Sequence, residues 1–261
     1  MNAFLIYDRE RLARNRWFAE TLIDKFRSRG WNLELKLAED MVLTKREKLP
    51  ELVLMRCVRP ALSRWFESKG VRVVNSAWVS EICNDKLRTI QHFGASGIPV
   101  LESRPLDFSN LFPFPFVLKT LDGHGGQEVF RVENTEQISL ILAQIPGKSW
   151  LIQRLCDTPG RDVRVYVIGN RIVAAMERTS ETDFRSNYSL GGSARKHKMT
   201  RMEREVVEKI LSLAHFDFVG IDLIFDSGCP ILNEIEDVVG CRMVYAQGDL
   251  DILEVFIKYL S

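Results

Sequence analysis

The sequence predicts an α/β protein in which an open α/β sheet is followed by units of mixed α+β type. Short apolar runs alternate with helical periodicities over the first 85 residues or so, which is typical of an open α/β sheet. Further along, two pairs of apolar runs are joined by short turns, which is typical of β-hairpins. With 261 residues, 46% of them hydrophobic, the chain is long enough for two or three compact units.

The N-terminal unit, residues 1–85, is expected to alternate strands with helices. Phe18, Leu22 and Phe26 recur at intervals of four residues, which predicts an amphipathic helix that ends at Gly30. The other predicted elements of this unit are strands over residues 4–7, 33–37, 52–55 and 71–74 and a helix over residues 61–69.

Two further units are expected, residues 86–149 and residues 150–261. Thr200 and Glu203 match a capping box, which predicts a helix from there to about residue 214. The other predicted elements are a helix over 86–95 followed by a turn at 97–99, strands over 116–119, 129–132 and 150–155, a helix over 137–145, a hairpin of 163–168 and 171–176 turned by Gly169-Asn170, a second hairpin around 226–230, and a final helix.

Composition excludes several classes of partner. Lysine plus arginine (36) nearly equals aspartate plus glutamate (35), so the net charge of +1 gives no reason to expect nucleic acid or an anionic membrane as a partner. No apolar run approaches the roughly 20 residues of a membrane helix, and the first residues lack the features of a signal peptide. Five cysteines without a Cys-x-x-Cys pair favour reduced thiols, so a cytoplasmic protein is expected, and four dispersed histidines disfavour a zinc site.

Three carboxylates on the second predicted hairpin suggest a metal site. Glu234 and Glu236 are two residues apart on one strand, so they share a face. If the hairpin brings Asp222 alongside them, three hard oxygen donors converge, and Mg²⁺ is the ion that such donors favour. The alternative interpretation is a solvated strand face.

A glycine-rich turn between two predicted strands suggests a phosphate site. Gly123, Gly125 and Gly126 would let backbone amides approach a phosphate closely, and Lys119 at the strand end could reach the same anion. The alternative is a flexible hairpin with an incidental lysine.

Other polar segments are weaker candidates. The polar stretch 177–192 is long for a loop within a compact domain and is either functional or a solvated surface loop. Asp162 follows a Pro-Gly turn and could accept a hydrogen bond from a ribose hydroxyl. Arg56 and Arg59 follow a predicted strand, where they could bind an anionic substrate, although exposed surface arginines are the favoured interpretation.

Taken in order along the chain, these segments resemble the ATP-grasp superfamily and, within it, the RimK-like carboxylate–amine ligases. The resemblance covers nearly the whole chain and is strongest from Asn84 onward. Residues 84–91 are similar to the entry helix of the family, whose lysine, here Lys86, reaches the nucleotide phosphates. Residues 117–126 are similar to its phosphate-covering loop, in which Lys119 is the second ATP lysine. The resemblance implies an ATP-grasp fold preceded by an N-terminal open α/β domain.

The resemblance also implies the remaining contacts to ATP and metal. The segment from Gln153 is similar to the adenine hinge, and segments 174–178 and 183–187 are close to a signature of the RimK-like branch. The implied ATP-binding residues are Lys86, Lys119, Gly123, Gly125, Gly126, Gln153, Arg154, Leu155, Asp162, Arg185, Ser186 and Asn187. The implied metal ligands are Asp222, Glu234 and Glu236.

The sequence departs from the family pattern at four positions and one turn. His124, Glu128 and Arg154 replace a small hydroxyl residue, a glycine and a glutamate, respectively. Glu236 replaces the usual metal-binding asparagine, and the Ser-Pro-Gly that commonly follows is absent from residues 237–243. Since that turn helps to shape the acceptor site of the family, the resemblance does not carry over a particular substrate.

The expected activity is that of an ATP-dependent carboxylate–amine ligase. A carboxylate would attack the γ-phosphate to give an acyl phosphate and ADP, and an amine would then form an amide or peptide bond. Lys119 and Arg185 are the expected catalytic residues on phosphate, and Arg242 is a candidate for holding the acyl phosphate or the substrate carboxylate. Phosphoryl transfer without amide formation and non-catalytic binding of Mg·ATP are the alternatives.

The expected cofactors are ATP and one or two Mg²⁺ ions, with Mn²⁺ as an alternative ion. The expected partners are an amino acid or peptide as the carboxylate and as the amine substrate, with no nucleic acid and no membrane. A homo-oligomer is compatible with the sequence.

Overall fold

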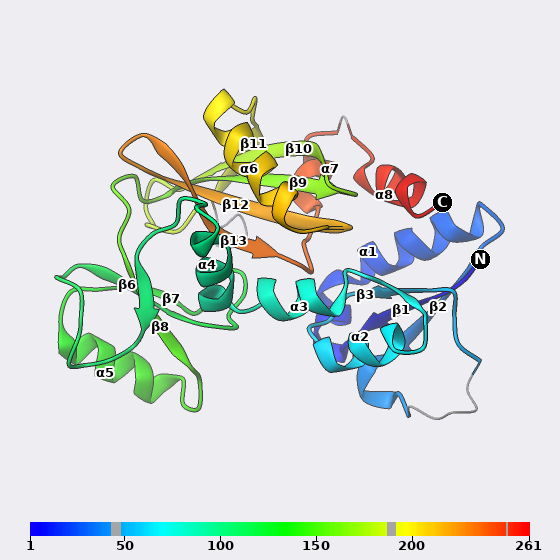
Figure 1. The fold of residues 1–261 in the computed structure, drawn as a ribbon, viewed down its shortest axis with the longest axis horizontal. Helices are drawn as coiled ribbons and strands as arrows, with labels where there is room; N and C mark the ends of the chain where they lie inside the picture. Colours follow the sequence, from blue (N-terminus) through cyan, green and yellow to red (C-terminus); the bar gives the residue numbers. More distant parts are fainter. Residues whose placement is uncertain (43–47, 187–191, 249) are drawn as a thin grey trace.

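Three β-sheets flanked by helices make up the protein (Figure 1). A computed structural model describes residues 1–42, 48–186, 192–248 and 250–261. In these residues no helix is long and apolar enough to cross a bilayer. The mixture of one parallel sheet with two antiparallel sheets agrees with the predicted α/β class with α+β units.

The N-terminal sheet is parallel, with the strand order β2-β1-β3-β4. Its elements are β1 (Asn2–Tyr7), α1 (Arg9–Arg27), β2 (Asn32–Leu37), the 3-10 helix η1 (Ala38–Asp40), β3 (Leu52–Met55), α2 (Pro60–Glu67), β4 (Arg72–Val74) and α3 (Ala77–Cys83). The side chain of Asp8 caps α1 by accepting a hydrogen bond from the Arg11 backbone amide. Phe18, Leu22 and Phe26 are buried in the core that α1 shares with the sheet, and each contributes roughly 1.5–3 kcal/mol by burial.

The middle sheet is antiparallel, with the strand order β5-β8-β6-β7. The elements of this region are α4 (Lys86–Ala95), β5 (Ser103–Pro105), β6 (Phe116–Thr120), β7 (Val129–Val132), α5 (Thr135–Gln144) and β8 (Trp150–Arg154). The boundary predicted at residue 150 assigned β8 to the C-terminal unit, whereas the strand pairs with β5 and β6. Turn signals show where the chain reverses but not which strand a segment will pair with, so this pairing could not be predicted from them. The division into three units itself stays a prediction.

The large C-terminal sheet is antiparallel, with the strand order β11-β10-β9-β12-β13. Its elements are β9 (Arg161–Ile168), β10 (Arg171–Thr179), β11 (Ser193–Lys196), α6 (Arg201–Leu213), β12 (Phe218–Asp226), β13 (Cys229–Glu236), α7 (Arg242–Ala246) and α8 (Ile252–Leu260). Gly169 and Asn170 both take positive φ in the β9–β10 turn. The capping box of Thr200 and Glu203 is present at the start of α6, which confirms both local predictions.

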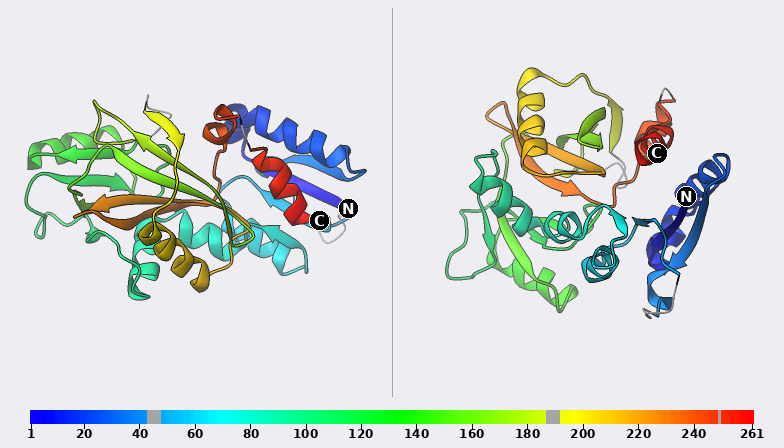
Figure 2. Two further views of the ribbon diagram at one scale, coloured as in Figure 1. Left: turned by 90° about the horizontal axis from the view of Figure 1, so that it is seen from above. Right: turned by 45° about the vertical axis from the view of Figure 1, so that its right-hand side comes forward.

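The C-terminal helix joins the large sheet to the N-terminal unit. α8 lies beside α1 in each view (Figures 1 and 2), and residues of both helices share one apolar core. Lys25 pairs with Asp251 at 2.5 Å, and Arg29 pairs with Glu254. Because the apolar core crosses from the first sheet to the third, the N-terminal sheet is fixed against the hairpin β12–β13 that carries the predicted metal ligands.

Candidate active site

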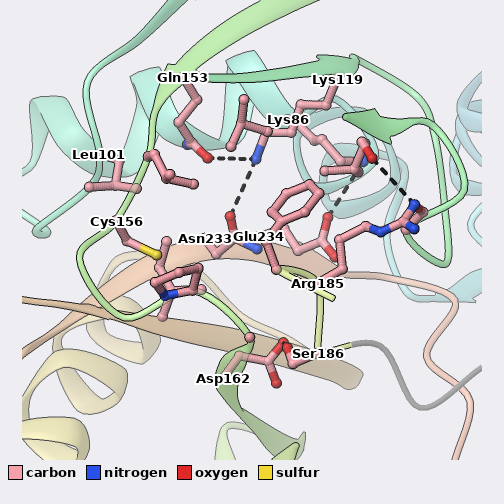
Figure 3. A pocket seen from close by; sticks show the side chains of 18 of the residues that line it. Lys86, Leu101, Lys119, Gln153, Cys156, Asp162, Arg185, Ser186, Asn233 and Glu234 are labelled. Atoms are coloured by element: carbon pink, nitrogen blue, oxygen red, sulfur yellow. Dashed lines mark hydrogen bonds and ion pairs between the residues drawn. The ribbon is translucent and has the colours of Figure 1, made fainter. Parts of the chain in front are cut away.

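A pocket lies where the middle sheet, the large sheet and the start of α4 meet (Figure 3). Its volume is about 100 Å³, below the roughly 300–1,000 Å³ of typical ligand sites, and oppositely charged side chains contact one another inside it. Twelve predicted site residues line the pocket: Lys86, Lys119, Gly123, Gly125, Gly126, Gln153, Arg154, Leu155, Asp162, Arg185, Ser186 and Glu234.

An apolar wall accompanies these residues, and of its members only Leu155 was predicted from the sequence. Val117 lines the pocket because it shares a face of β6 with Lys119, and the period of two would have identified it. The other apolar lining residues are Leu101, Val129, Leu155, Phe184 and Ile224. They come from separate segments, and only tertiary packing brings them together. An apolar slot beside a few polar groups is the usual form of a small-molecule site.

Lys119 projects into the pocket from the middle of this wall. Its ammonium group donates to Gln153 Oε1 at 2.9 Å and to Asn233 Oδ1 at 3.3 Å, and the residue is only 3% exposed. Burial lowers the pKa of Lys119 to about 8, although the negative charge of Glu234 opposes this shift. A phosphate in the pocket would favour the protonated lysine.

Lys86 enters the pocket from the first turn of α4. Asp85 caps this helix by accepting from the Arg88 backbone amide at 3.0 Å, which fixes where the helix begins. The Lys86 ammonium group donates to the carbonyl of Gly123 and lies 3.5 Å from Glu234 Oε2. Two lysines from different elements and one carboxylate are therefore gathered at one end of the pocket.

The glycine-rich turn is tightly packed at its first glycine. A Cβ atom on Gly123 would lie 2.3 Å from Thr120 Oγ1 and 2.8 Å from Glu128 Oε2, so a side chain does not fit there. Gly125 and Gly126 have φ values of 68° and 76°, which glycine adopts without strain. Glu128, where the family often has a glycine, accepts from the Thr120 hydroxyl at 2.5 Å and so closes the base of the turn.

The segment after β10 reaches this glycine-rich turn through Arg185. The Arg185 guanidinium pairs with Asp183 at 2.7 Å and donates to the carbonyls of Gly126 at 2.8 Å and Val129 at 3.3 Å. The predicted phosphate contacts Arg185 and Gly126 are therefore brought together. Asn187, the other predicted phosphate contact of this segment, lies outside the described residues.

Asp162, predicted to contact ribose, is buried against an arginine. Both of its oxygens accept from Arg178, at 2.6 and 2.7 Å, and Oδ2 also accepts from the Ser186 hydroxyl at 2.5 Å. Burial raises the pKa of Asp162, although Arg178 opposes the shift. Asp162 lines the pocket, and its contact with ribose stays a prediction.

The three predicted metal ligands lie on one hairpin, as expected. Asp222 on β12 is the register partner of Glu234 on β13. Asp222 is 1% exposed and accepts from Arg164 through two bonds of 2.7 Å and from Arg178 at 2.7 Å. Burial alone would raise the pKa of Asp222, and the two guanidinium groups outweigh it and lower the pKa.

These carboxylates do not form an open metal site. Among the described residues, no group of three or more His, Cys, Asp or Glu side chains is arranged to hold a metal ion, because Arg164 pairs with both Asp222 and Glu236. Glu234 and Glu236 remain 25% and 23% exposed, and the buried Oε2 of Glu236 accepts no well-aligned hydrogen bond beside its ion pair. These two carboxylates fit a hard cation, whereas Asp222 would first have to leave its arginines.

Three further arginines were singled out from the sequence. Arg154 lines the pocket, its guanidinium pairs with Asp226 at 2.5 Å, and its backbone amide donates to the carbonyl of Glu102 at 3.0 Å. Arg242 lies at the exposed start of α7 and does not line the pocket, so its predicted role in holding an acyl phosphate gains no support. Arg56 is not a surface arginine, because it is 7% exposed and donates to the carbonyl of Val239 at 2.7 Å.

Comparison with known proteins identifies the family of the chain. Residues 88–260 match the model of the RimK-like ATP-grasp domain. The chain belongs to the RimK-like ATP-grasp family. The resemblance seen in the sequence is therefore confirmed, and the expectation of an ATP-grasp ligase is confirmed at the level of the family.

Individual relatives agree with this assignment. A probable alpha-L-glutamate ligase of Parasynechococcus marenigrum is 30% identical over 213 residues, which cover 77% of this chain and 46% of that protein. Human N-acetylaspartylglutamate synthase A is 28% identical over 256 residues, covering 88% and 63% of the two chains. An uncharacterized protein of Mycoplasma pneumoniae is 24% identical, covering 98% and 91%.

Solved structures confirm the fold of this RimK-like chain. A RimK domain ATP-grasp protein of Sphaerobacter thermophilus has a TM-score of 0.76 at 19% identity, with 99% of both chains covered. D-alanine–D-alanine ligase of Bacillus anthracis, complexed with ATP, has a TM-score of 0.77 at 14% identity, with 99% and 95% covered. The predicted ATP-grasp fold is thus confirmed over the full length of the chain.

The different surroundings of the carboxylates predict different effects of their substitution. Asp222→Asn leaves two buried guanidinium groups partly uncompensated and is expected to destabilise the fold by about 3–5 kcal/mol, which lowers the melting temperature by about 10 °C. Glu234→Gln changes a partly exposed side chain and is expected to lower it by no more than about 3 °C. Thermal melts followed by circular dichroism measure both, and equal melting temperatures for Asp222→Asn and the wild type would contradict the inferred network.

The pKa of Lys119 predicts that ATP binding is coupled to proton uptake. Above pH 8 the free lysine is mostly neutral, whereas phosphate favours its charged form. ATP affinity is therefore expected to fall by up to about tenfold per pH unit above pH 8. Calorimetry at pH 8.5 in two buffers of different ionisation enthalpy measures the proton uptake. Lys119→Arg, which stays charged, should abolish it; proton uptake that persists in this variant would assign the effect to another group.

Proposed function

We propose that this chain is an ATP-dependent ligase that joins a carboxylate to an amine through an acyl phosphate. The observation that carries the proposal is the convergence of Lys86, Lys119 and Glu234 in one pocket beside a glycine-rich turn and an apolar wall. Catalysis of phosphoryl transfer depends mainly on positioning and charge neutralisation. It therefore requires cations and backbone amides for the phosphates and a carboxylate for a metal.

Each part of the pocket has a role in this reaction. The apolar wall takes the adenine, and Lys86, Lys119 and Arg185 neutralise the phosphate oxygens. A carboxylate oxygen of the substrate attacks the γ-phosphorus, the bond to the β,γ-bridging oxygen breaks, and ADP leaves. The amine then attacks the acyl carbon, and inorganic phosphate departs as the amide forms.

The metal fits the same end of the pocket. ATP-grasp proteins use ATP and Mg²⁺ in general, and in this chain Glu234 and Glu236 would hold the ion. When bound, Mg²⁺ supplies further neutralisation of the phosphate charge. Lys86, which lies 3.5 Å from Glu234, would then be available to the phosphates.

The substrates proposed are amino acids or peptides. The relatives include proteins named as alpha-L-glutamate ligases and as N-acetylaspartylglutamate synthase. Both names describe the joining of an amino acid through its amine or its carboxylate, so a panel of amino acids and short peptides is the appropriate test set.

The proposal predicts that ADP forms only when a suitable carboxylate is present, and that sustained turnover also needs an amine. Glu234→Gln should lower the rate at least about 100-fold, because a charge-stabilising group at the reacting phosphate is lost. Coupled ADP assays across the panel, followed by mass spectrometry of the products, measure this. Hydroxylamine in place of the amine should trap the acyl phosphate as a hydroxamate.

Glu133→Gln is the matched control, because Glu133 is exposed and, among the described residues, its carboxylate pairs only with Arg131. Its rate should equal that of the wild type. A phosphorylated product without amide would establish a phosphotransferase instead, and binding of Mg·ATP without any ADP formation would establish a non-catalytic binder. Either outcome would overturn the ligase proposal.

A further inference from the structure

Asp237 directly follows Glu236, at the point where the sequence leaves the family's Ser-Pro-Gly pattern. Its side chain is 3% exposed and forms no ion pair with a described residue. Its two oxygens accept instead from two amides, Asn75 Nδ2 at 2.7 Å and Asn84 Nδ2 at 3.0 Å. A buried carboxylate is costly unless hydrogen bonds compensate it, so this arrangement fixes all three side chains.

Asn75 connects the start of β12 to the end of β13. These are the two strands of the hairpin that carries Asp222, Glu234 and Glu236. Asn75 follows β4 of the N-terminal sheet. Its side-chain oxygen accepts from the backbone amides of Asp217 and Phe218, at 3.0 and 2.9 Å, where β12 begins. Its amide group donates to the Phe218 carbonyl at 2.8 Å and to Asp237, where β13 has just ended. A single side chain thus bonds both strands at the open end of the hairpin.

Asn84 extends the cluster to the phosphate lysine. It ends α3 and donates to the Ser80 carbonyl at 2.7 Å as well as to Asp237. Lys86 is only two residues further along the chain, in the first turn of α4. Asp237 therefore connects the strand end at Glu236 to the segment that carries Lys86.

Hydrogen bonds from side chains of other elements also hold the segment after Asp237. Arg56 at the end of β3 donates to the carbonyl of Val239 at 2.7 Å. The hydroxyl of Tyr166 on β9 donates to the carbonyl of Gly240 at 3.0 Å. Val239 also packs so closely on β12 that a Cβ atom on Gly220 would lie 2.7 Å from its Cγ2. Polar contacts from two sheets replace the missing turn motif.

We propose that Asp237 is a positioning residue, which sets Glu236 and Lys86 at the spacing that the phosphates require by binding Asn75 and Asn84. This inference rests on the proposed function. Asp237 touches no reacting group and acts through its neighbours. Since a displacement of about 1 Å at a reacting centre can cost about 100-fold in rate, the loss of one of its oxygens should affect turnover more than stability alone explains.

Asp237→Asn tests the proposal. In this variant an NH₂ group replaces one carboxylate oxygen, so the amide donor that it faces loses its acceptor. We expect kcat for ADP formation to fall by about tenfold or more, with KM for ATP changed by less than about threefold because Asp237 does not line the pocket. All rates are measured well below the melting temperature of each variant.

Asp217→Asn is the matched control. Asp217 is also a buried aspartate that joins β12 to the N-terminal sheet, but its carboxylate contacts Arg72 at 3.3 Å and Tyr259 at 2.7 Å. It should lower the melting temperature and leave kcat within about twofold of the wild type. If kcat falls no further in Asp237→Asn than in Asp217→Asn, the positioning role is wrong.

A second measurement separates this inference from the proposed function. If the wild type forms no ADP with any substrate, the ligase proposal fails, and calorimetry with ADP in the presence and absence of Mg²⁺ decides the positioning role. Asp237→Asn should then reduce the Mg²⁺-dependent gain in ADP affinity by about fivefold or more, and Asp217→Asn should preserve it. Equal gains in the two variants would overturn the inference.

Discussion

The arrangement of this protein depends on a buried chain of alternating charges. Asp162, Arg178, Asp222, Arg164 and Glu236 contact one another in that order across β9, β10, β12 and β13. A buried carboxylate without a partner is strongly disfavoured, so each member requires its neighbours, and a slip of one strand would leave several charges uncompensated. The network therefore specifies the register of the four strands that form the floor of the site, and the pocket is built on that register.

The same network changes the effect that Glu236 is expected to have on metal binding. A glutamate in place of the family's asparagine adds a negative charge, which by itself suggests firmer metal binding. In the structure Arg164 pairs with Glu236 as well as with Asp222, so the added charge is compensated inside the protein. Glu234, whose ion-pair partner is the Lys86 ammonium group at 3.5 Å, is the carboxylate most readily available to a cation. Glu236 thus takes part in the ion-pair network of the large sheet as well as in the candidate metal site.

Local features of the sequence predicted most of the helices and strands. The sequence did not show which distant segments pair with one another. Three predicted features depend on residues that are close in sequence, and the structure contains them. They are the periodicity of α1, the capping box at Thr200, and the presence of Lys119 and the glycine-rich turn in one pocket. The place of β8 in the middle sheet and the pairing of Asp222 with arginines depend on strand pairing across distant segments, which periodicity does not encode. The short helices α3 and α7 (Ala77–Cys83 and Arg242–Ala246) span too few turns to show a period.

The hairpin β12–β13 is held at both ends by residues outside it, which explains how one small element can set the geometry of the whole pocket. At its turn, Asp226 pairs with Arg154, the last residue of β8, and the Ser227 amide donates to Asp157. At its open end, Asn75 binds both strands from the N-terminal sheet. Because β8 and the N-terminal sheet are tied to opposite ends of one hairpin, both of them determine the position of its middle, where Glu234 lies 3.5 Å from Lys86.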